Sequence, residues 1–187
     1  DGNQKVISNL TISLSGVDNV GLFAALDQVS SVKDLTIDNA SITGSSMVDP
    51  NDANNRLGGQ NVGILAGQGD GSITGISTSG VVFGDINVGG LIGVTYNNAV
   101  IDRCVSTATV TGTFAANYIG GIAGVVGQYS AGSISNTYAP GRVSGSYMVG
   151  GLIGHLNGFV GFDHNPIANV IVINNCYASG DVSASSQ

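Results

Sequence analysis

A glycine-containing segment of seven residues recurs five times along the chain, and this repetition constrains the fold more than any other feature. Its third copy, residues 87–93, reads Asn-Val-Gly-Gly-Leu-Ile-Gly. The copies begin at Asn19, Asn61, Asn87, Tyr118 and Met148, so their spacings are 42, 26, 31 and 30 residues. Self-similarity at a period of about 20–50 residues indicates a solenoid, a propeller or a repeat array.

Each seven-residue segment is followed by a second recurrent half that contains two short apolar stretches. In the third copy they cover 101–105 and 110–112, which read Ile-Asp-Arg-Cys-Val and Val-Thr-Gly. The equivalent pairs are 32–36 with 42–44, 73–77 with 82–84, 134–138 with 143–145, and 173–177 with 182–184. Short apolar stretches bounded by Gly, Asn or Ser are typical of strands. One repeat therefore predicts three short strands in about 30 residues.

We predict an all-β fold, a right-handed parallel β-helix (solenoid) of about five to six coils of three short strands. A single repeat cannot bury its apolar face, whereas stacked coils bury a continuous core at a spacing of ~4.8 Å. A Greek-key sandwich also uses many short strands, but it gives no reason for one motif to recur. The predicted coils cover 1–16 (partial), 19–44, 61–84, 87–112, 118–145 and 148–185, within a single solenoid segment, 1–187.

The repeated glycines have a structural role in this interpretation. A residue without Cβ allows either a corner with positive φ or a close approach of neighbouring backbones, and an aligned column allows it at every coil. The glycines assigned to this role are Gly21, Gly63, Gly89, Gly90, Gly93, Gly120, Gly121, Gly124, Gly150, Gly151 and Gly154.

The polar composition favours turns over helices and excludes some partners. All twelve acidic residues are aspartate, and aspartate, asparagine, serine and glycine favour turns. A net charge of −7 with only five Lys and Arg counts against nucleic-acid binding. Since no apolar run approaches the ~20 residues of a bilayer span, we also expect no membrane insertion by this segment.

The five glycine segments resemble the GLUG motif, which is named for Gly-Leu-any-Gly. Residues 90–93 and 151–154 match this pattern, while Ile122 replaces the leucine, Ile64 replaces the second glycine and Ala25 replaces the final glycine in other copies. GLUG repeats are found in large bacterial surface and secreted proteins, including adhesins and the non-catalytic regions of some immunoglobulin A proteases. The resemblance covers nearly the whole chain and implies an extracellular segment of a larger bacterial surface protein.

The protease activity of such relatives is not expected here. A zinc protease of that kind needs a His-Glu-x-x-His helix that holds zinc and supplies a general base. The chain contains no glutamate, so this site cannot form within it. We predict no catalytic residues, no metal site and no cofactor.

The two cysteines are predicted to be free. Cys104 and Cys176 occupy the same position of the second recurrent half, in coils three and five, with Thr137 between them in coil four. Two coil spacings separate their Cα atoms by roughly 9–10 Å, which exceeds the ~7 Å limit for a disulfide.

Two insertions, 45–60 and 155–169, interrupt the coils, and loops of this length on a rigid scaffold often carry binding sites. The speculative ligand-binding residues are Asp49, Asp52, Asn54, Tyr147, His155, Phe159, Phe162, Asp163 and His164. The run 49–55 is rich in Asp and Asn, but it lacks the Gly and Glu of an EF-hand loop. A solvated turn-rich loop is the favoured interpretation, and calcium binding is the weaker alternative.

Enzymatic parallel β-helices supply an alternative function, that of a polysaccharide lyase or hydrolase. Such enzymes cluster carboxylates on consecutive coils, whereas the corresponding positions here offer only Asp102 with Arg103. Ice binding would need stacked Thr-x-Thr pairs, and Thr107 and Thr109 have no such pair in the next coil.

We therefore predict a non-enzymatic adhesin or structural stalk module, located outside the cell or on the bacterial surface. The alternative is a polysaccharide-active or glycan-binding β-helix. The expected partner is a host or environmental glycan or protein, or none if the segment is a spacer.

Overall fold

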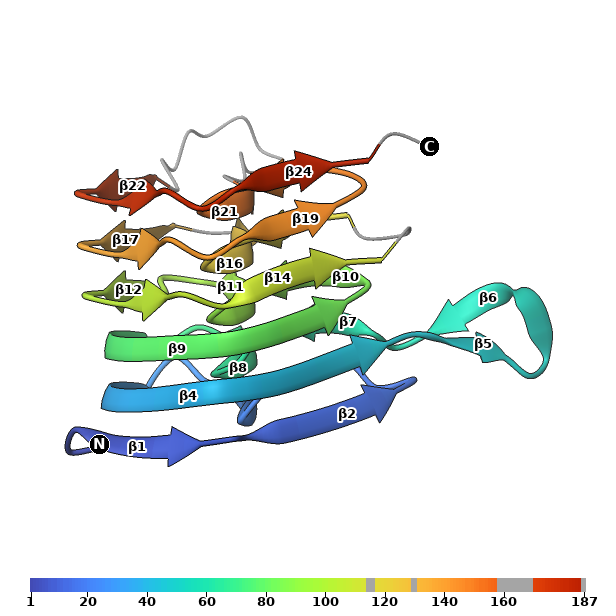
Figure 1. Cartoon of the computed structure of the whole chain (residues 1–187), viewed down its shortest axis with the longest axis horizontal. Coiled ribbons are helices and arrows are strands. Elements are labelled where there is room, and N and C mark those ends of the chain that lie inside the picture. The colour runs from blue at the N-terminus through green and yellow to red at the C-terminus, as the bar shows by residue number, and fades with distance from the viewer. Residues whose placement is uncertain (114–116, 129–130, 158–169, 186–187) are drawn as a thin grey trace, which may run out of the picture.

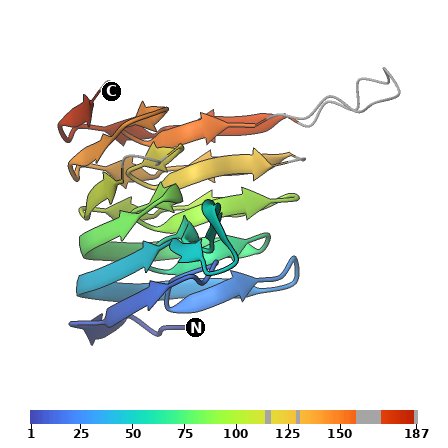
Figure 2. The same ribbon diagram turned by 90° about the vertical axis from the view of Figure 1, so that its right-hand side faces the viewer.

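The chain forms a stack of parallel coils, which rises from β1 beside the N-terminus to β24 beside the C-terminus (Figure 1). The computed structural model describes residues 1–113, 117–128, 131–157 and 170–185, and strands are the regular elements of these residues. Equivalent strands of successive coils pair in parallel, as the flat coils of Figure 2 also show. The parallel β-helix predicted from the repeats is confirmed.

Three sheets form the sides of the stack. The thirteen-stranded sheet contains β1 (Lys5–Ser8), β2 (Thr11–Ser15), β4 (Ser31–Ser45), β9 (Ser72–Gly84), β12 (Val100–Asp102), β13 (Val105–Ser106), β14 (Thr109–Gly112), β17 (Gly132–Ser135), β18 (Tyr138–Ala139), β19 (Val143–Gly145), β22 (Ile171–Asn174), β23 (Tyr177–Ala178) and β24 (Val182–Ala184). The four-stranded sheet contains β7 (Gln60–Val62), β10 (Ile86–Gly89), β15 (Ile119–Gly120) and β20 (Val149–Gly150). The five-stranded sheet contains β3 (Phe23–Leu26), β8 (Ala66–Gly69), β11 (Ile92–Tyr96), β16 (Ala123–Gln128) and β21 (Ile153–Leu156).

The strands divide each repeat differently from the prediction. The seven-residue segment was predicted as one strand, but a corner at Gly90 and Leu91 divides it between β10 and β11, which belong to different sheets. The two apolar stretches that follow were predicted as separate strands, yet they lie in one sheet and merge in β4 and β9. Glycine without a Cβ allows the close approach of backbones at this corner, whereas the second half stays in one sheet although a residue with positive φ, such as Arg103 or Asn136, lies within the first of its two stretches.

Inward-facing residues of equivalent strands form apolar columns. Ile73 pairs with Ile101, and Ile101 pairs with Ile134, and each of the three is at most 1% exposed. Val110 and Val143 form a second such column and are fully buried. Each such side chain contributes about 1.5–3 kcal/mol of burial free energy, so the stacked columns are the principal source of stability.

The paired glycines serve close backbone approach rather than positive φ. A Cβ on Gly90 would lie 2.2 Å from Ser106 Oγ and 2.3 Å from the carbonyl oxygen of Gly121 in the next coil. The paired glycines are not among the residues with positive φ. The sequence is compatible with either a positive-φ corner or a close backbone approach at these glycines, and the structure shows the close approach.

Asparagine takes the positive-φ corner instead. Asn19, Asn61 and Asn87 begin three copies of the repeat and have φ values of 59°, 58° and 53°. Asparagine tolerates this left-handed conformation better than most residues. The Asn61 Nδ2 group donates to Asn19 Oδ1 at 2.7 Å, and Asn87 Nδ2 donates to Asn61 Oδ1 at 2.6 Å. This ladder holds three successive corners in register.

The two cysteines share a column, as their positions in the repeat indicate. The backbone N–H of Cys104 donates to Thr137 Oγ1 at 3.3 Å, and the pairing of Tyr138 with Tyr177 places Cys176 beside Thr137 on its other side. Both thiols are free, and burial raises the pKa of Cys104 to about 11.

We expect Gly121→Ala to destabilise the fold more than Gly151→Ala, although both alter the same position of the motif. A Cβ on Gly121 would lie 2.3 Å from the Gly151 carbonyl oxygen, whereas one on Gly151 would lie 2.9 Å from the Ala178 side chain. Overpacking of this kind costs about 1–3 kcal/mol. Chemical denaturation of the two variants measures the difference, and equal losses would contradict the close-approach role.

Thiol labelling tests the burial of the cysteine column. Because the thiolate is the reactive form and the pKa of Cys104 is raised to about 11, iodoacetamide at pH 8 should modify Cys176 in the native chain. Cys104 should react only after denaturant is added. Mass spectrometry of tryptic peptides identifies the labelled residue, and early labelling of Cys104 would show that the column opens.

Candidate functional site

Hydroxyl side chains form columns on the outer face of the thirteen-stranded sheet, near its border with the four-stranded sheet. Val110 and Val143 point inward, so the residues next to them along each strand point outward. Thr111 pairs with Ser144, and Ser144 pairs with Ser183, which gives one column. One residue beyond the ends of β14, β19 and β24, a second column consists of Thr113, Ser146 and Ser185.

These columns contain one Thr-x-Thr pair, at 111 and 113, and two Ser-x-Ser pairs, so they differ from the stacked Thr-x-Thr array that was expected to be absent. At Thr107 and Thr109 the next coil has residues without a hydroxyl group. The stacked pairs lie further along the chain, at 111 with 113, 144 with 146, and 183 with 185. They extend over three coils, and below them Phe83 pairs with Thr111 and breaks the first column.

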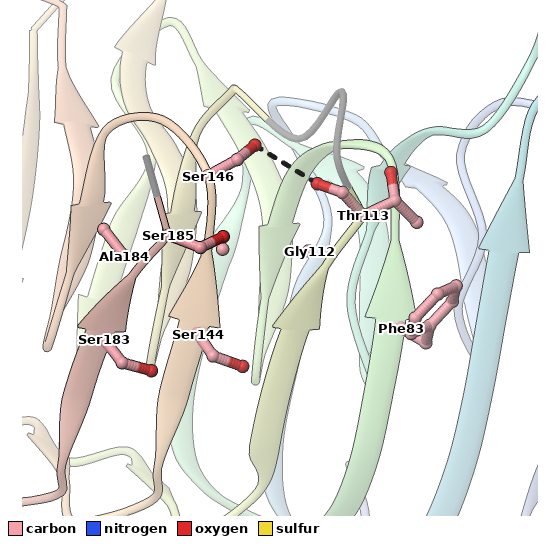
Figure 3. A pocket seen from close by; sticks show the side chains of 9 residues that line it. Phe83, Gly112, Thr113, Ser144, Ser146, Ser183, Ala184 and Ser185 are labelled. Carbon is pink, nitrogen blue, oxygen red and sulfur yellow. Dashed lines mark hydrogen bonds between the residues drawn. The ribbon is translucent and has the colours of Figure 1, made fainter. Parts of the chain in front are cut away.

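A groove of about 500 Å³ lies over these columns. It is lined by Phe83, Gly112, Thr113, Ser144, Gly145, Ser146, Ser183, Ala184 and Ser185. Figure 3 shows Phe83 at one end of the groove and the serines of two successive strands at the other. None of these lining residues is charged. The groove therefore offers hydroxyl groups and one aromatic ring, since Phe83 is 41% exposed.

The groove hydroxyls are held in place by bonds between coils. Ser144 Oγ donates to Thr111 Oγ1 at 3.4 Å. Ser146 Oγ donates to the carbonyl oxygen of Thr113 at 3.3 Å, the contact drawn in Figure 3. Because a hydroxyl has one proton and two lone pairs, Ser144 Oγ can still accept hydrogen bonds beyond the one that it donates to Thr111.

Asp85 joins the groove to the first insertion. Its Oδ1 atom accepts a hydrogen bond from Thr113 Oγ1 at 2.7 Å. Its Oδ2 atom accepts from the Ser46 backbone N–H at 2.7 Å and from Ser46 Oγ at 2.5 Å. Burial alone would raise the pKa of Asp85, but these bonds and the charge of Arg56 outweigh it, so the pKa lies below 3.8.

The first insertion is a β-hairpin rather than the turn-rich loop expected from its composition. Strands β5 (Met47–Asp49) and β6 (Asp52–Leu57) pair antiparallel and project from the end of β4 (Figure 1). The Asp49 carboxylate accepts from the Asn51 backbone N–H at 2.8 Å and from Asn55 Nδ2 at 3.0 Å. These bonds lower the pKa of Asp49 and fix the turn. Composition misled the prediction because only Pro50 and Asn51 form the turn, while the polar residues on either side of them lie in the two strands.

The predicted ligand-binding residues do not form one cluster among the described residues. Asp52 is exposed at the turn of the hairpin, and the side chain of Asn54 lies outside the described part of the structure. Tyr147 is 55% exposed and follows β19, which is three pairing steps from the hairpin-bearing strand β4. His155 lies within strand β21 rather than in a loop, and it stacks on Tyr118 with ring centroids 5.0 Å apart.

The remaining predicted residues belong to the second insertion. Phe159, Phe162, Asp163 and His164 lie outside the described residues. Their proposed binding role stays a prediction.

Asp102, the carboxylate considered for an enzymatic role, is part of a structural network. It accepts hydrogen bonds from Ser135 Oγ at 2.7 Å and from Asn136 Nδ2 at 2.8 Å, and it pairs with Arg103 at 3.2 Å. These interactions, with the Ser135 bond the largest, lower its pKa. Within the described ranges, no group of three or more His, Cys, Asp or Glu residues could hold a metal ion.

The sequence pattern did not predict the groove, because the third predicted stretch of each repeat ends one residue before the second column of hydroxyl residues. The predicted third stretch ended at glycine or alanine in each coil, as in residues 110–112. The next residue is Thr113, Ser146 or Ser185 in the last three coils. The recurring pattern of valine, hydroxyl, small residue and hydroxyl would have identified both columns.

The comparisons with known proteins agree with this repeat structure. Residues 84–111, which run from the end of β9 through most of β14, match the family model described as the GLUG motif. The repeat unit that contains residues 84–111 therefore carries the GLUG motif. A stretch of 101 residues is 41% identical to halomucin from Haloquadratum walsbyi and covers 54% of this chain.

A solved structure shares the fold of these GLUG repeats. It is a protein from Bacteroides ovatus assigned as an immunoglobulin A1 protease, with a TM-score of 0.69 and 25% identity over 97% of this chain. The chain covers 51% of that structure and 1% of halomucin. These likenesses characterise the chain as a surface or structural repeat module. In the described part of the chain, no helix has the length and hydropathy to cross a bilayer.

Asp85→Asn tests the link between hairpin and groove through its pH dependence. Because the folded-state pKa is lowered, the carboxylate stabilises the fold above the unfolded-state value of 3.8, and this contribution is lost as the pH falls through the folded-state pKa. We expect a loss of about 1–3 kcal/mol at pH 7, which shrinks below pH 3.8.

Urea denaturation at several pH values measures this difference in the free energy of unfolding. The matched control is Asp181→Asn, an exposed aspartate just before β24, which should cost no more than about 0.5 kcal/mol. A pH-independent loss in Asp85→Asn would contradict the role of the ionised carboxylate.

Proposed function

We propose that this chain is a non-enzymatic adhesive module of a secreted or surface-exposed protein, in which a stiff β-helix holds binding features at a fixed edge. The observation that carries the proposal is the direct connection between hairpin and groove through Asp85. The hairpin, which ends at Leu57, and the groove lining, which begins at Phe83, thereby share one edge of the stack. The GLUG repeats and the likeness to halomucin support a location outside the cell.

The stiffness of the stack supports a role in presentation. Backbone hydrogen bonds connect every pair of neighbouring coils, and apolar columns fill the interior. Such a stack holds its outer features at a constant spacing. A constant spacing suits the attachment of a partner.

The hairpin offers an apolar surface for contact with a partner. Met47, Val48 and Leu57 are 40–48% exposed, although the hairpin lies outside the core. Exposed apolar side chains on a projecting element are typical of interaction sites. Arg56 Nη1 donates to Ser46 Oγ at 3.3 Å, so the base of the hairpin is tied to the same network as the groove.

A hairpin-truncated variant tests the adhesive role. Met47 and Leu57 are paired neighbours, so residues 48–56 can be replaced by an Asn-Gly turn without altering the coils. We expect beads coated with the chain to adhere to an array of glycans and extracellular-matrix proteins, and the truncated variant to adhere less. The thermal midpoint of the variant should stay close to that of the parent chain, because the hairpin contributes little to the core.

The control is a variant that keeps the length of the parent chain but has the order of residues 48–56 scrambled. Loss of adhesion in both variants with an unchanged midpoint supports a sequence-specific contact at the hairpin. If the parent chain adheres to no glycan or protein spot of the array, the adhesive role is overturned and the chain is a spacer.

A further inference from the structure

We propose that the groove binds an uncharged oligosaccharide, an inference that rests on the adhesive function above and names its ligand. The apolar face of one sugar ring would lie on Phe83. The sugar hydroxyls would bond to the side chains that line the groove beyond it, namely Thr113, Ser144, Ser146, Ser183 and Ser185.

The chemistry of the lining favours a neutral polyhydroxyl ligand. Each Ser or Thr hydroxyl can donate one hydrogen bond and accept two, which is also the capacity of a sugar hydroxyl. The lining residues include no cation that could neutralise a sulfate or carboxylate. The net charge of −7 adds a long-range repulsion of polyanions.

Phe83 supplies the apolar part of the site. At the positions paired with it in the neighbouring coils, Thr43 and Thr111, the chain has a hydroxyl residue. Phe83 is 41% exposed at the end of the groove, so the fold gains little from burying this ring. Ligand sites typically combine an aromatic surface with a few placed polar groups, and this groove has both.

A peptide fits the groove less well than a sugar. Peptides that bind to sheets commonly add a strand to a free edge. Strands β9, β14 and β19 beneath the groove are each paired on both sides, so their backbone hydrogen-bonding groups are already used. Among the described residues β24 pairs only with β19, but a peptide strand added to β24 would lie at the opposite end of the groove from Phe83 and leave that ring unused. Short hydroxyl side chains on their outer face also form no pocket for an apolar peptide side chain.

The groove sets the direction and size of its ligand. Its lining residues come from four successive coils, those of β9, β14, β19 and β24. Three steps of ~4.8 Å give a length of roughly 14 Å along the stack. This length accommodates a short oligosaccharide, or one stretch of a polysaccharide, that runs parallel to the axis of the β-helix.

Affinity gel electrophoresis tests this assignment directly. The probes are two neutral polymers, hydroxyethylcellulose and xyloglucan, and two anionic polymers, alginate and polygalacturonate. We expect retardation of the chain in at least one neutral gel and none in the anionic gels. Phe83→Ala should weaken binding about tenfold, and the double variant Ser144→Ala with Ser183→Ala should weaken it by a similar factor.

Matched control variants lie on the same outer face but away from the groove. Val81→Ala shortens an apolar side chain that is 50% exposed on the same strand as Phe83. Ser31→Ala with Ser133→Ala removes two outward hydroxyls near the other end of the thirteen-stranded sheet. Both controls should bind within twofold of the parent chain, and circular dichroism should show an unchanged fold in all four variants.

The outcomes separate this inference from the adhesive function. Retardation in neutral gels that is lost in the groove variants supports the inference. Preference for the anionic polymers, or binding that the groove variants do not change, overturns it. If bead adhesion depends on a protein spot and no neutral polymer binds, the adhesive function stands and the saccharide assignment fails.

Discussion

Parallel hydrogen bonding between coils is the constraint on which the rest of the structure depends. It places each residue directly above its equivalent in the preceding coil, so one sequence position becomes one column. The isoleucine column at Ile73, Ile101 and Ile134 and the asparagine ladder at the corner both follow from this register. A side chain in such a stack must pack or bond with the equivalent side chain of the next coil, whether identical or different, at the coil spacing of ~4.8 Å.

Polar groups satisfy this condition by bonding to their own equivalents. Asn61 donates to Asn19 and accepts from Asn87, so this central residue of the ladder uses both the nitrogen and the oxygen of its amide. The ladder ends where Tyr118 begins the next repeat, and Asn87 Oδ1 has no hydrogen-bond partner in the described part of the structure. A buried amide oxygen without a partner costs about 1–3 kcal/mol, so the end of the ladder destabilises the fold at this one corner.

The sequence predicts the features that repeat and fails on those that do not. Five in-register copies were enough for the parallel β-helix, and they place Thr137 between Cys104 and Cys176 as the structure does. The corner at Gly90 was not predictable, because a glycine pair is compatible with both positive φ and close approach until the next coil is in place. The hairpin was mistaken for a loop since it occurs once and its two short strands have no equivalent in other coils. Groove residues were missed because alternation assigns them to the outer face, where core packing gives no signal.

The groove residues were missed because, in such a stack, the residues that determine the fold and those that can bind a ligand lie on opposite faces of each strand. Residues 82–85 read Val-Phe-Gly-Asp and residues 110–113 read Val-Thr-Gly-Thr, and the two stretches lie in adjacent coils with the same register. Their inward residues, valine and glycine, are identical, while both outward residues differ. Because alternate residues point to opposite faces, the outer face can change from hydroxyls to an aromatic ring and a carboxylate without a change in the core. The aromatic end of the groove and its link to the hairpin both arise from this single coil, at Phe83 and Asp85.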